Sequence, residues 1–276
     1  MGLRCGVLGD PIEHSLSPVL HQAGYDALGL DWEYAAHRVA SGGLPTFLDG
    51  LRHDPAHDWR GLSLTMPLKR EAVPLVDELS KRARLAGTVN TLVLEDDRIV
   101  GDNTDIPGAI AAIRERTSAP LASAVIIGGG ATATSIGLAL ADLGVRRLEI
   151  LARSTERAFE AVETVARHPG RPDVTARRLD EVGKLTADLV ASTIPAEAQD
   201  KRLVTSCGGI PIVFEVLYHP WPTPLAASIG DRVLVGGLDL LVHQAAVQFE
   251  LFTGEPAPVA VMRAAGERAL ADRASP

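Results

Sequence analysis

Apolar residues along this chain follow two alternating patterns. Short runs rich in valine, leucine and isoleucine predict buried strands, and the longer stretches between them, with apolar residues every three or four positions, predict amphipathic helices. This alternation is typical of α/β architecture with parallel strands. In the first hundred residues it predicts strands at 5–9, 33–39 and 62–64, helices at 18–28, 45–51 and 67–71, and a hairpin of residues 88–94 and 98–102.

A second α/β unit follows the segment 102–105, which is dense in turn and capping residues. The pattern there predicts strands at 124–127, 148–151, 189–191, 211–216 and 233–235, and helices at 131–143, 155–166, 238–252 and 259–270. Because the last two helices come after the second unit ends, we expect them to fold back on the first. The predicted domains are residues 1–104 plus 238–276, and residues 105–237.

Composition narrows the classes of function. The 276 residues carry 27 Lys and Arg against 35 Asp and Glu, and the net charge of −8 is opposite to that of a typical nucleic-acid-binding protein. No apolar run approaches the roughly 20 residues that cross a bilayer. The two cysteines, Cys5 and Cys207, form no disulfide framework. The amino terminus enters a strand-like run without a signal-peptide pattern, so we expect a cytoplasmic protein.

A glycine-rich turn carries the cofactor signal. Gly128, Gly129, Gly130, Ala131 and Thr132 stand between a predicted strand and a predicted helix and, with the alanine that follows, match G-x-G-x-x-A, a variant of the dinucleotide fingerprint. Glycines let a pyrophosphate approach the backbone, and the helix amino terminus offers N–H groups and positive potential. We interpret the turn as a dinucleotide site, and a purely structural tight turn is the alternative.

The end of the next predicted strand indicates which dinucleotide binds. A site selective for NAD usually has an acidic residue there, which holds the ribose hydroxyls. This chain instead has Arg153, Ser154 and Arg157, whose guanidinium and hydroxyl groups suit a 2′-phosphate. These residues favour NADP. The alternative is that Ser154 caps a helix and that both arginines are solvated.

Two other segments indicate a substrate site. Ser15 and Ser17 are two apart in an extended stretch, so their hydroxyls can converge on one acceptor such as a carboxylate. Ser17 also suits an ordinary helix cap before Pro18. Pro67 begins a predicted helix with Lys69 in its first turn, where a cation opposes the helix dipole. Because a structural role gains nothing from that placement, we favour proton transfer by Lys69 over a surface lysine.

Asp105 and Gln244 are candidate site residues, but each also has a plausible structural role. Asp105 precedes a helix predicted over residues 107–114, which it could simply cap. Gln244 shares a helical stripe with Leu240 and Val247, so its amide points toward an apolar surface or a cleft. Such an amide needs a partner from the backbone or from a ligand.

Four motifs in order resemble those of the shikimate dehydrogenase family. They are Ser15-Leu-Ser17-Pro18, Thr65-Met-Pro-Leu-Lys69, Gly87-Thr-Val-Asn90-Thr and Gly101-Asp-Asn-Thr-Asp105. Gly236-Gly237-Leu238 and Gln244-Ala-Ala246 resemble the family's closing helix, and Tyr218 stands where the family has a substrate-contacting tyrosine. The resemblance runs over essentially the whole chain.

The resemblance implies an α/β protein of two domains, a substrate-binding catalytic domain and a Rossmann-type NADP-binding domain, with the active site in the cleft between them. The implied reaction is the NADP-dependent, reversible reduction of 3-dehydroshikimate to shikimate, in the pathway to chorismate and aromatic amino acids. Lys69 and Asp105 would be the proton-transfer pair. The implied substrate contacts are Ser15, Ser17, Thr65, Asn90, Tyr218 and Gln244. The implied cofactor contacts are Gly128, Gly129, Gly130, Ala131, Thr132, Arg153, Ser154, Arg157, Val216 and Gly237.

The chain departs from the family pattern at several positions. Ala131 replaces a common glycine, Ala152 replaces an asparagine beside the 2′-phosphate site, and residues 192–195 differ from the frequent Asn-Ala-Thr. These departures bear on cofactor affinity more than on the chemistry. Glu215 stands where an aspartate is commoner, and the sequence offers no account of its effect.

Two alternatives share much of this pattern. A quinate or dual quinate/shikimate dehydrogenase that uses NAD has the same fold and the same catalytic pair, but Arg153 and Arg157 argue against NAD. A non-catalytic regulatory protein that binds NADP or shikimate would have no need of intact Lys69 and Asp105. A turnover assay separates these possibilities.

Other classes of function lack their required residues. His53 and His57 are four apart, but Pro55 between them breaks the helix that would align two metal ligands, and we expect no metal. The chain has neither the nucleophile elbow of serine hydrolases nor the phosphate loop of P-loop enzymes. We expect a small-molecule substrate, no nucleic acid and no membrane as partners, and either a monomer or a homodimer.

Overall fold

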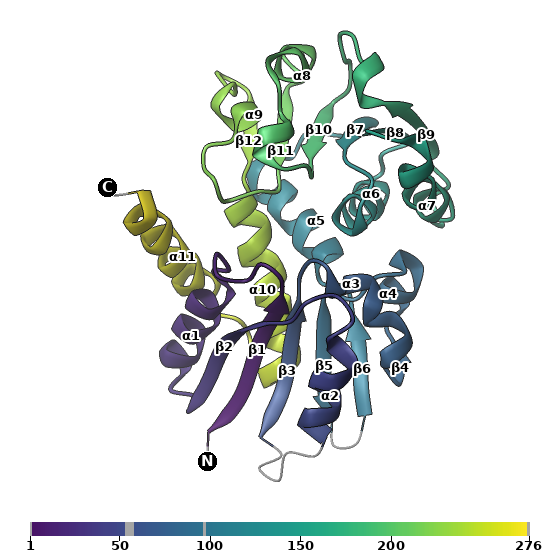
Figure 1. Cartoon of the computed structure of the whole chain (residues 1–276). Helices are drawn as coiled ribbons and strands as arrows, with labels where there is room; N and C mark the ends of the chain where they lie inside the picture. Colours follow the sequence, from purple (N-terminus) through teal and green to yellow (C-terminus); the bar gives the residue numbers. More distant parts are fainter. Residues whose placement is uncertain (1, 53–57, 96–97, 275–276) are drawn as a thin grey trace. The chain divides into compact units, whose positions relative to one another are not determined.

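A computed structural model describes residues 2–52, 58–95 and 98–274, except for the side chains of Arg157 and Ala274. The chain forms two compact units, one of Met1–Thr104 with Leu241–Pro276 and one of Asp105–Leu240. Each unit has its own β-sheet with helices packed beside it (Figure 1). The α/β fold class that the apolar pattern predicts is confirmed.

The first unit is built on a mixed six-stranded sheet of order β2-β1-β3-β5-β6-β4. β1 pairs in parallel with β2 and β3, whereas β5 runs antiparallel to β3 and β6, so the predicted hairpin is the pair β5 and β6. The strands are β1 (Leu3–Gly9), β2 (Trp32–Arg38), β3 (Trp59–Leu64), β4 (Glu78–Leu79), β5 (Thr91–Glu95) and β6 (Arg98–Asp102). The helices are α1 (Ser17–Leu28), α2 (Leu44–Arg52), α3 (Leu68–Glu71), α4 (Lys81–Ala86), α11 (Val259–Ala274) and most of α10 (Gly237–Thr253).

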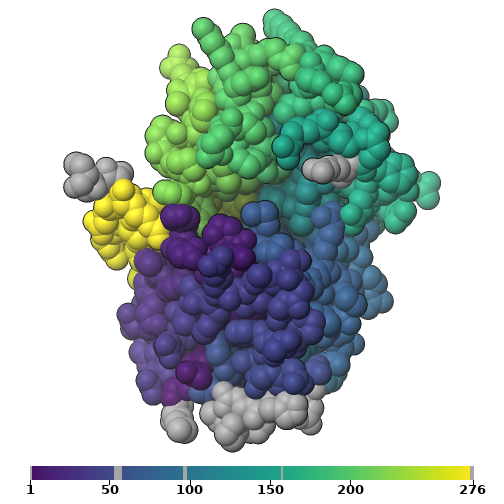
Figure 2. Space-filling view, in the orientation of Figure 1, coloured from purple at the N-terminus to yellow at the C-terminus, as the bar shows by residue number. Residues whose placement is uncertain are grey.

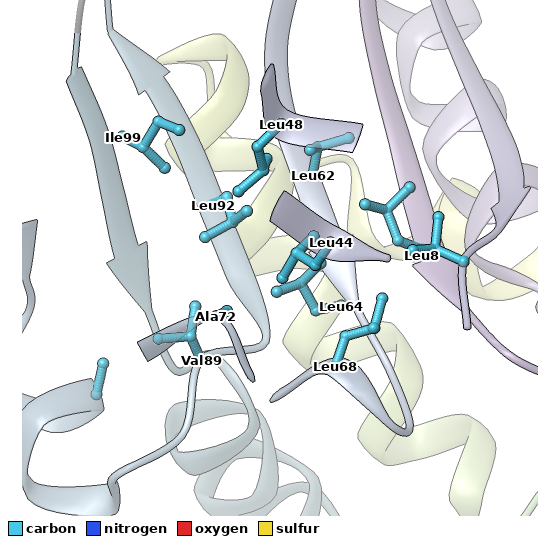
Figure 3. Close-up of a cluster of buried hydrophobic side chains, with 12 residues drawn as sticks. Leu8, Leu44, Leu48, Leu62, Leu64, Leu68, Ala72, Val89, Leu92 and Ile99 are labelled. Atoms are coloured by element: carbon cyan, nitrogen blue, oxygen red, sulfur yellow. The ribbon is translucent and has the colours of Figure 1, made fainter. Parts of the chain in front are cut away.

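Helices pack on both faces of this sheet. On one face Leu44 and Leu48 of α2 belong to a buried aliphatic cluster with Leu62 of β3 and Leu92 of β5 (Figure 3). On the other face α10 comes so close that a methyl group on Gly61 of β3 would lie 2.1 Å from the Phe252 ring. A larger residue at position 61 would therefore push α10 off the sheet.

An aromatic cluster fills the space between α1, β2 and α10. The fully buried ring of His21 stacks on Tyr34, with centroids 4.2 Å apart and an interplanar angle of 8°, and Tyr25 packs on Phe249 at 5.3 Å. Burial lowers the pKa of His21 from 6.5 to about 3, so the imidazole is neutral at physiological pH. α11 lies beside α1 on the outside of this cluster (Figures 1 and 2).

The second unit is a wholly parallel six-stranded sheet of order β12-β11-β10-β7-β8-β9. Counted along the unit, the strands lie in the order 3-2-1-4-5-6 from the β9 edge, which is the Rossmann topology. The strands are β7 (Ser123–Ile127), β8 (Arg147–Ala152), β9 (Asp173–Arg178), β10 (Leu189–Ser192), β11 (Ile212–Glu215) and β12 (Val233–Val235). The helices are α5 (Asp105–Arg116), α6 (Ala131–Asp142), α7 (Thr155–Ala166), α8 (Lys201–Ser206) and α9 (Pro224–Ala227). In this topology a ligand binds where the strand order reverses, between β7 and β10.

Some local expectations are wrong. Ser17 does not cap α1: it is the first residue of the helix, Leu16 holds the cap position, and the Ser17 N–H donates to Ser15 Oγ at 3.3 Å. The pattern misses β9 because this edge strand is mostly polar, and its apolar alternation is limited to the half-buried Val174 and Ala176. It also misses the short helices α4, α8 and α9, whose four to six residues are too few to show a helical period.

In the described ranges no helix is long and apolar enough to cross a membrane. Among these same residues no group of three or more His, Cys, Asp and Glu side chains could hold a metal ion, and His53 and His57 lie outside them. Cys5 and Cys207 are buried thiols, and burial raises the pKa of Cys5 to about 12 and that of Cys207 to about 11. Neither cysteine is a reactive thiolate.

Candidate active site

The glycine-rich turn links β7 to α6 at the reversal of strand order. Gly128 has φ of +118°, and a methyl group on it would lie 2.1 Å from Thr193 Oγ1. A methyl group on Gly129 would lie 3.0 Å from the Cα of Ala158. Gly130 occupies the cap position of α6, and a Cβ there would meet nothing within 4 Å in the described structure. Glycine is therefore required at position 128 and favoured by close packing at position 129, and the open side of Gly130 leaves the helix amino terminus approachable.

These residues fit a dinucleotide. α6 starts without a side-chain cap among the described residues, so its first N–H groups are available to a pyrophosphate. Ala131 and Thr132 form its first turn and are half-buried. Ala131, in place of the family's common glycine, is accommodated as the first helical residue.

The end of β8 holds the predicted 2′-phosphate residues. Arg153 is exposed, and the Ser154 hydroxyl donates to Glu156 Oε2 at 2.5 Å. That hydrogen bond lowers the pKa of the Glu156 carboxyl below its ordinary value. A carboxylate thus lies on the hydroxyl that the prediction assigns to a phosphate. The side chain of Arg157, at the start of α7, lies outside the described part of the structure.

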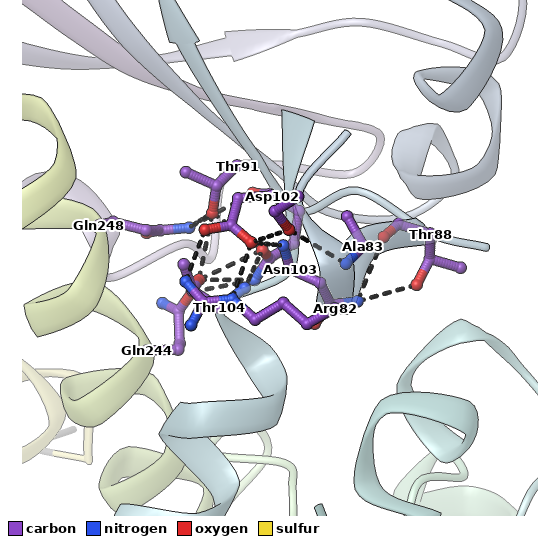
Figure 4. Close-up of polar contacts among 11 residues, drawn as sticks. Arg82, Ala83, Thr88, Thr91, Asp102, Asn103, Thr104, Gln244 and Gln248 are labelled. Atoms are coloured by element: carbon purple, nitrogen blue, oxygen red, sulfur yellow. Dashed lines mark hydrogen bonds and ion pairs between the residues drawn. The ribbon is translucent and has the colours of Figure 1, made fainter. Parts of the chain in front are cut away.

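In the first unit, Asn90 lies in a buried hydrogen-bond network. Figure 4 labels Thr91, Thr104, Gln244 and Gln248 of this network. Asn90 Oδ1 accepts from the Thr104 N–H at 2.7 Å, and Nδ2 donates to Thr104 Oγ1 at 3.0 Å. Asn90 Nδ2 and Thr104 Oγ1 both reach Gln244 Oε1 at 3.4 Å, while Gln244 Nε2 donates to the Leu241 carbonyl at 3.2 Å. Two predicted substrate residues, 154 positions apart in the sequence, therefore lie side by side.

Three residues of this network, Gln248, Ser63 and Tyr34, are not predicted from the sequence. Gln248 is fully buried, and its amide donates to Thr91 Oγ1 at 3.0 Å while its oxygen accepts from Ser63 Oγ at 2.8 Å. Tyr34 donates to Ser63 Oγ at 2.6 Å and continues the chain of bonds into the aromatic cluster. Gln248 is four residues after Gln244 on α10, and that spacing is the signal that identifies it as a second inward amide.

A buried ion pair anchors the segment that leads to Asp105. Asp102 accepts two hydrogen bonds from the Arg82 guanidinium, at 2.7 and 2.5 Å, and one from Ser80 Oγ at 2.5 Å. Burial acts to raise the pKa of Asp102, but the bonds from Arg82 and Ser80 outweigh it and lower that pKa. Asn103 Nδ2 donates to Thr88 Oγ1 at 2.9 Å. The backbone is thus held on both sides immediately before the candidate catalytic aspartate.

The backbone around Thr65 and Lys69 is bonded to the segment that contains Asn90. The Leu64 N–H donates to the Asn90 carbonyl at 2.7 Å, and the Val89 N–H donates to the Lys69 carbonyl at 2.8 Å. A methyl group on Gly9 would lie 2.3 Å from Thr65 Cγ2, so Thr65 packs against the end of β1, where the loop to Ser15 and Ser17 begins. The residues predicted for substrate binding in the first unit gather where β1 and β3 end and β5 begins.

The remaining candidates belong to the second unit. Asp105 is the first residue of α5, two residues earlier than the predicted start of that helix, and it is 5% exposed. Val216 and Tyr218 follow β11. Gly237 opens α10, and a methyl group on it would lie 2.6 Å from the Val216 carbonyl oxygen. The structure therefore brings together Val216 and Gly237, the two residues predicted for the nicotinamide end.

Comparison with known proteins decides the family. A family model described as the shikimate dehydrogenase substrate binding domain matches residues 7–92, and one described as the shikimate 5′-dehydrogenase C-terminal domain matches residues 237–265. Shikimate dehydrogenase (NADP(+)) of Desulfitobacterium hafniense is 34% identical, over 96% of this chain and 97% of its own length. The chain belongs to the shikimate dehydrogenase family. The resemblance that the four motifs indicate is confirmed.

Solved structures of the shikimate dehydrogenase family and its relatives share the fold. Shikimate dehydrogenase of Mycobacterium tuberculosis is 38% identical, and the match covers 98% of this chain and 99% of that one with a TM-score of 0.85. Quinate dehydrogenase of Corynebacterium glutamicum, in complex with NAD, is 28% identical over 97% of this chain and 99% of its own, with a TM-score of 0.87. The fold thus accommodates either activity, and the substrate and cofactor are decided by individual side chains.

Proposed function

We propose that this protein is an NADP-dependent shikimate dehydrogenase, an oxidoreductase that interconverts 3-dehydroshikimate and shikimate in the pathway to chorismate. The observation that carries the proposal is the match, over almost the whole length of both chains, to a curated relative named for that activity. The intact motifs around Lys69 and Asp105 support it, because a protein that only bound these ligands would have no need of a proton-transfer pair.

In this reaction NADP donates or accepts the hydride, and the chain's own residues supply binding and proton transfer. Lys69 and Asp105 pass a proton to and from the reacting oxygen and hold it by hydrogen bonds. Ser15 and Ser17 bind the substrate carboxylate, and Thr65, Asn90, Tyr218 and Gln244 bind the ring hydroxyls. The rigid network around Asn90 supports this role, since side chains locked by neighbours hold a substrate in one orientation.

Residues at the carboxyl edge of the second sheet would hold the cofactor. Residues Gly128 to Thr132 hold the pyrophosphate at the start of α6, and Val216 and Gly237 hold the nicotinamide end. Arg153, Ser154 and Arg157 hold the 2′-phosphate, and Ser154 exchanges its bond to Glu156 for one to a phosphate oxygen. The end of β8 favours NADP over NAD, because it is followed by Arg153 and not by the acidic residue that would hold free ribose hydroxyls.

The substrate-binding domain of this proposal is residues 1–104 plus 238–276, and the NADP-binding domain is residues 105–237. The two compact units, which divide after Thr104 and after Leu240, support this division. We place the enzyme in the cytoplasm, as a monomer or homodimer without nucleic acid or membrane partners. The net charge of −8 supports the lack of a nucleic-acid partner.

The decisive experiment measures initial rates at the nicotinamide absorbance band with purified protein, with shikimate and with quinate, each with NADP⁺ and NAD⁺. A strong preference for shikimate with NADP⁺ is expected. Turnover of quinate with NAD⁺ would retain the fold and the catalytic pair but contradict the specificity. No turnover with any combination would refute the enzymatic assignment and favour a binding protein.

A further inference from the structure

Glu215, at the end of β11, is a completely buried carboxylate that neither proton transfer nor phosphate binding uses. Its Oε2 accepts from Gln199 Nε2 and from Thr223 Oγ1, both at 2.8 Å, and its Oε1 accepts from the Leu217 N–H at 3.1 Å. Burial raises the pKa of this carboxyl, and the bond from Thr223 offsets part of that rise. So many donors around one buried acid require a structural account.

The hydrogen bonds of Glu215 close the loop of residues 216–223 at both ends. Leu217 is at the start of that loop and Thr223 at its end, and Thr223 Oγ1 also caps α9 by accepting from the Ala226 N–H at 3.2 Å. Glu215 therefore binds both ends of this loop.

Gln199 joins this loop to the neighbouring one. Its Nε2 donates to Ser192 Oγ at 3.1 Å, at the end of β10, and its Oε1 accepts from the Leu225 N–H at 3.0 Å. The Thr193 side chain in turn donates to the Ile127 carbonyl at 2.9 Å, directly before the glycine turn. Three loops at the carboxyl edge of the sheet are thus connected through buried side chains.

The loop held by Glu215 decides where Gly237 lies. A methyl group on Gly237 would be 2.3 Å from the carbonyl carbon of Leu217, so the backbones of residues 217 and 237 are in direct contact. The N–H of Leu217 is the group that Glu215 binds. A shift of the Leu217 peptide would separate Val216 from Gly237 or push them together.

We propose that Glu215 is a positioning residue for the nicotinamide end of NADP, which keeps residues 216–223 in the conformation that places Val216 against Gly237. The inference rests on the proposed function, in which Val216 and Gly237 contact the cofactor. Gln199 and Thr223 both donate to Glu215 Oε2, so the length of the glutamate side chain sets where these two donors meet it.

The test is Glu215→Gln, which keeps the volume and turns one acceptor oxygen into a donor that faces Gln199 and Thr223. NADPH binding is followed by nucleotide fluorescence, and KM is measured separately for NADP⁺ and shikimate. We expect the Kd for NADPH and the KM for NADP⁺ to rise about ten-fold, with the KM for shikimate little changed. A purely structural residue would lower the melting temperature without separating the two KM values.

The rescue variant exchanges the partners, Glu215→Gln with Gln199→Glu, so that a donor again meets an acceptor. We expect it to recover NADPH binding to within about three-fold of the unchanged protein, as coupled pairs do. The matched control is Glu149→Gln, which breaks the ion pair with Arg177 on the same sheet but touches neither loop, and should leave NADPH binding unchanged.

Normal NADPH affinity and a normal KM for NADP⁺ in Glu215→Gln would overturn the inference, as would failure of the exchange to restore binding. If Glu215→Gln does not fold, Thr223→Val removes one donor and leaves the acid, and unchanged NADPH binding in that variant would overturn the inference too. Lack of turnover in the unchanged protein would contradict the proposed function instead, and the NADPH binding measurements would still test Glu215.

Discussion

Protonation of His21 should make the first unit sensitive to acid. The ring is fully buried between α1, β2 and α10 and is stacked on Tyr34. Burial lowers its pKa from 6.5 to about 3. The unfolded chain therefore binds a proton at a pH where the folded chain does not, and stability is lost as the pH falls below 6.5.

The size of the effect follows from these two pKa values. One pKa unit corresponds to about 1.4 kcal/mol, so the shift from 6.5 to about 3 amounts to about 5 kcal/mol once the pH reaches 3. At pH 5 the same shift removes about 2 kcal/mol relative to pH 7.5. His21→Phe retains an aromatic ring for the stack on Tyr34 and binds no proton, so it should lack this part of the pH dependence.

Urea unfolding at pH 7.5 and pH 5.0, followed by tryptophan fluorescence, measures the difference. Trp32 reports on this region, because its ring lies 5.5 Å from that of Tyr25 in the same cluster. Between the two pH values the unchanged protein should lose about 2 kcal/mol more of its unfolding free energy than His21→Phe does. His14→Phe, at an exposed position, is the control and should behave as the unchanged protein. Equal losses in the unchanged protein and in His21→Phe would refute the reasoning.

Four other substitutions test the proposed site. Lys69→Ala should lower kcat by about 10² to 10⁴ because proton transfer is lost, while calorimetry still detects shikimate binding; a near-normal rate would exclude Lys69 from catalysis. Arg153→Ala should raise the KM for NADP⁺ about ten-fold and leave that for NAD⁺ nearly constant, whereas equal losses would place the 2′-phosphate elsewhere. Glu156→Gln should act in the opposite direction and lower the KM for NADP⁺ about three-fold, since it removes the negative charge that lies beside the Ser154 hydroxyl. A rise in this KM would show that the carboxylate helps to form the site. Gly237→Ala puts a methyl group 2.3 Å from the Leu217 carbonyl carbon, a strain of about 1–3 kcal/mol, and should weaken NADPH binding in fluorescence titrations; unchanged affinity would show that the loop yields freely.

Several features of the chain can be predicted from its sequence because they depend on residues that are close together in it. The glycine turn needs a residue that tolerates a φ of +118° and leaves no room for a side chain at position 128, and only glycine meets both demands. The second sheet follows from repeated strand and helix periods, since parallel strands linked by helices have few possible topologies. Motif order along the chain was enough to identify the family.

Edge strands and helix ends are harder to predict from the pattern of apolar and polar residues. β9 has no buried face along its length, and its pairing with β8 is decided by backbone hydrogen bonds of which the residue types give no sign. Serine is a common residue at helix caps, but the helix starts at Ser17 itself and the Ser15 hydroxyl accepts a hydrogen bond from its N–H. Which residue holds the cap position depends on backbone angles that residue types leave open.

Residue types along the chain therefore define the chemical groups and the order in which they occur: a phosphate-binding turn, basic residues after the second strand of its sheet, and a lysine and an aspartate in their motifs. Tertiary structure alone decided which groups meet. Asn90 joins Gln244 across 154 residues, Gln248 reaches Ser63 across 185, and Glu215 accepts from Gln199 of a neighbouring loop. Such contacts depend on how sheets and helices pack in three dimensions, and no periodicity along one strand or helix encodes the partner on another.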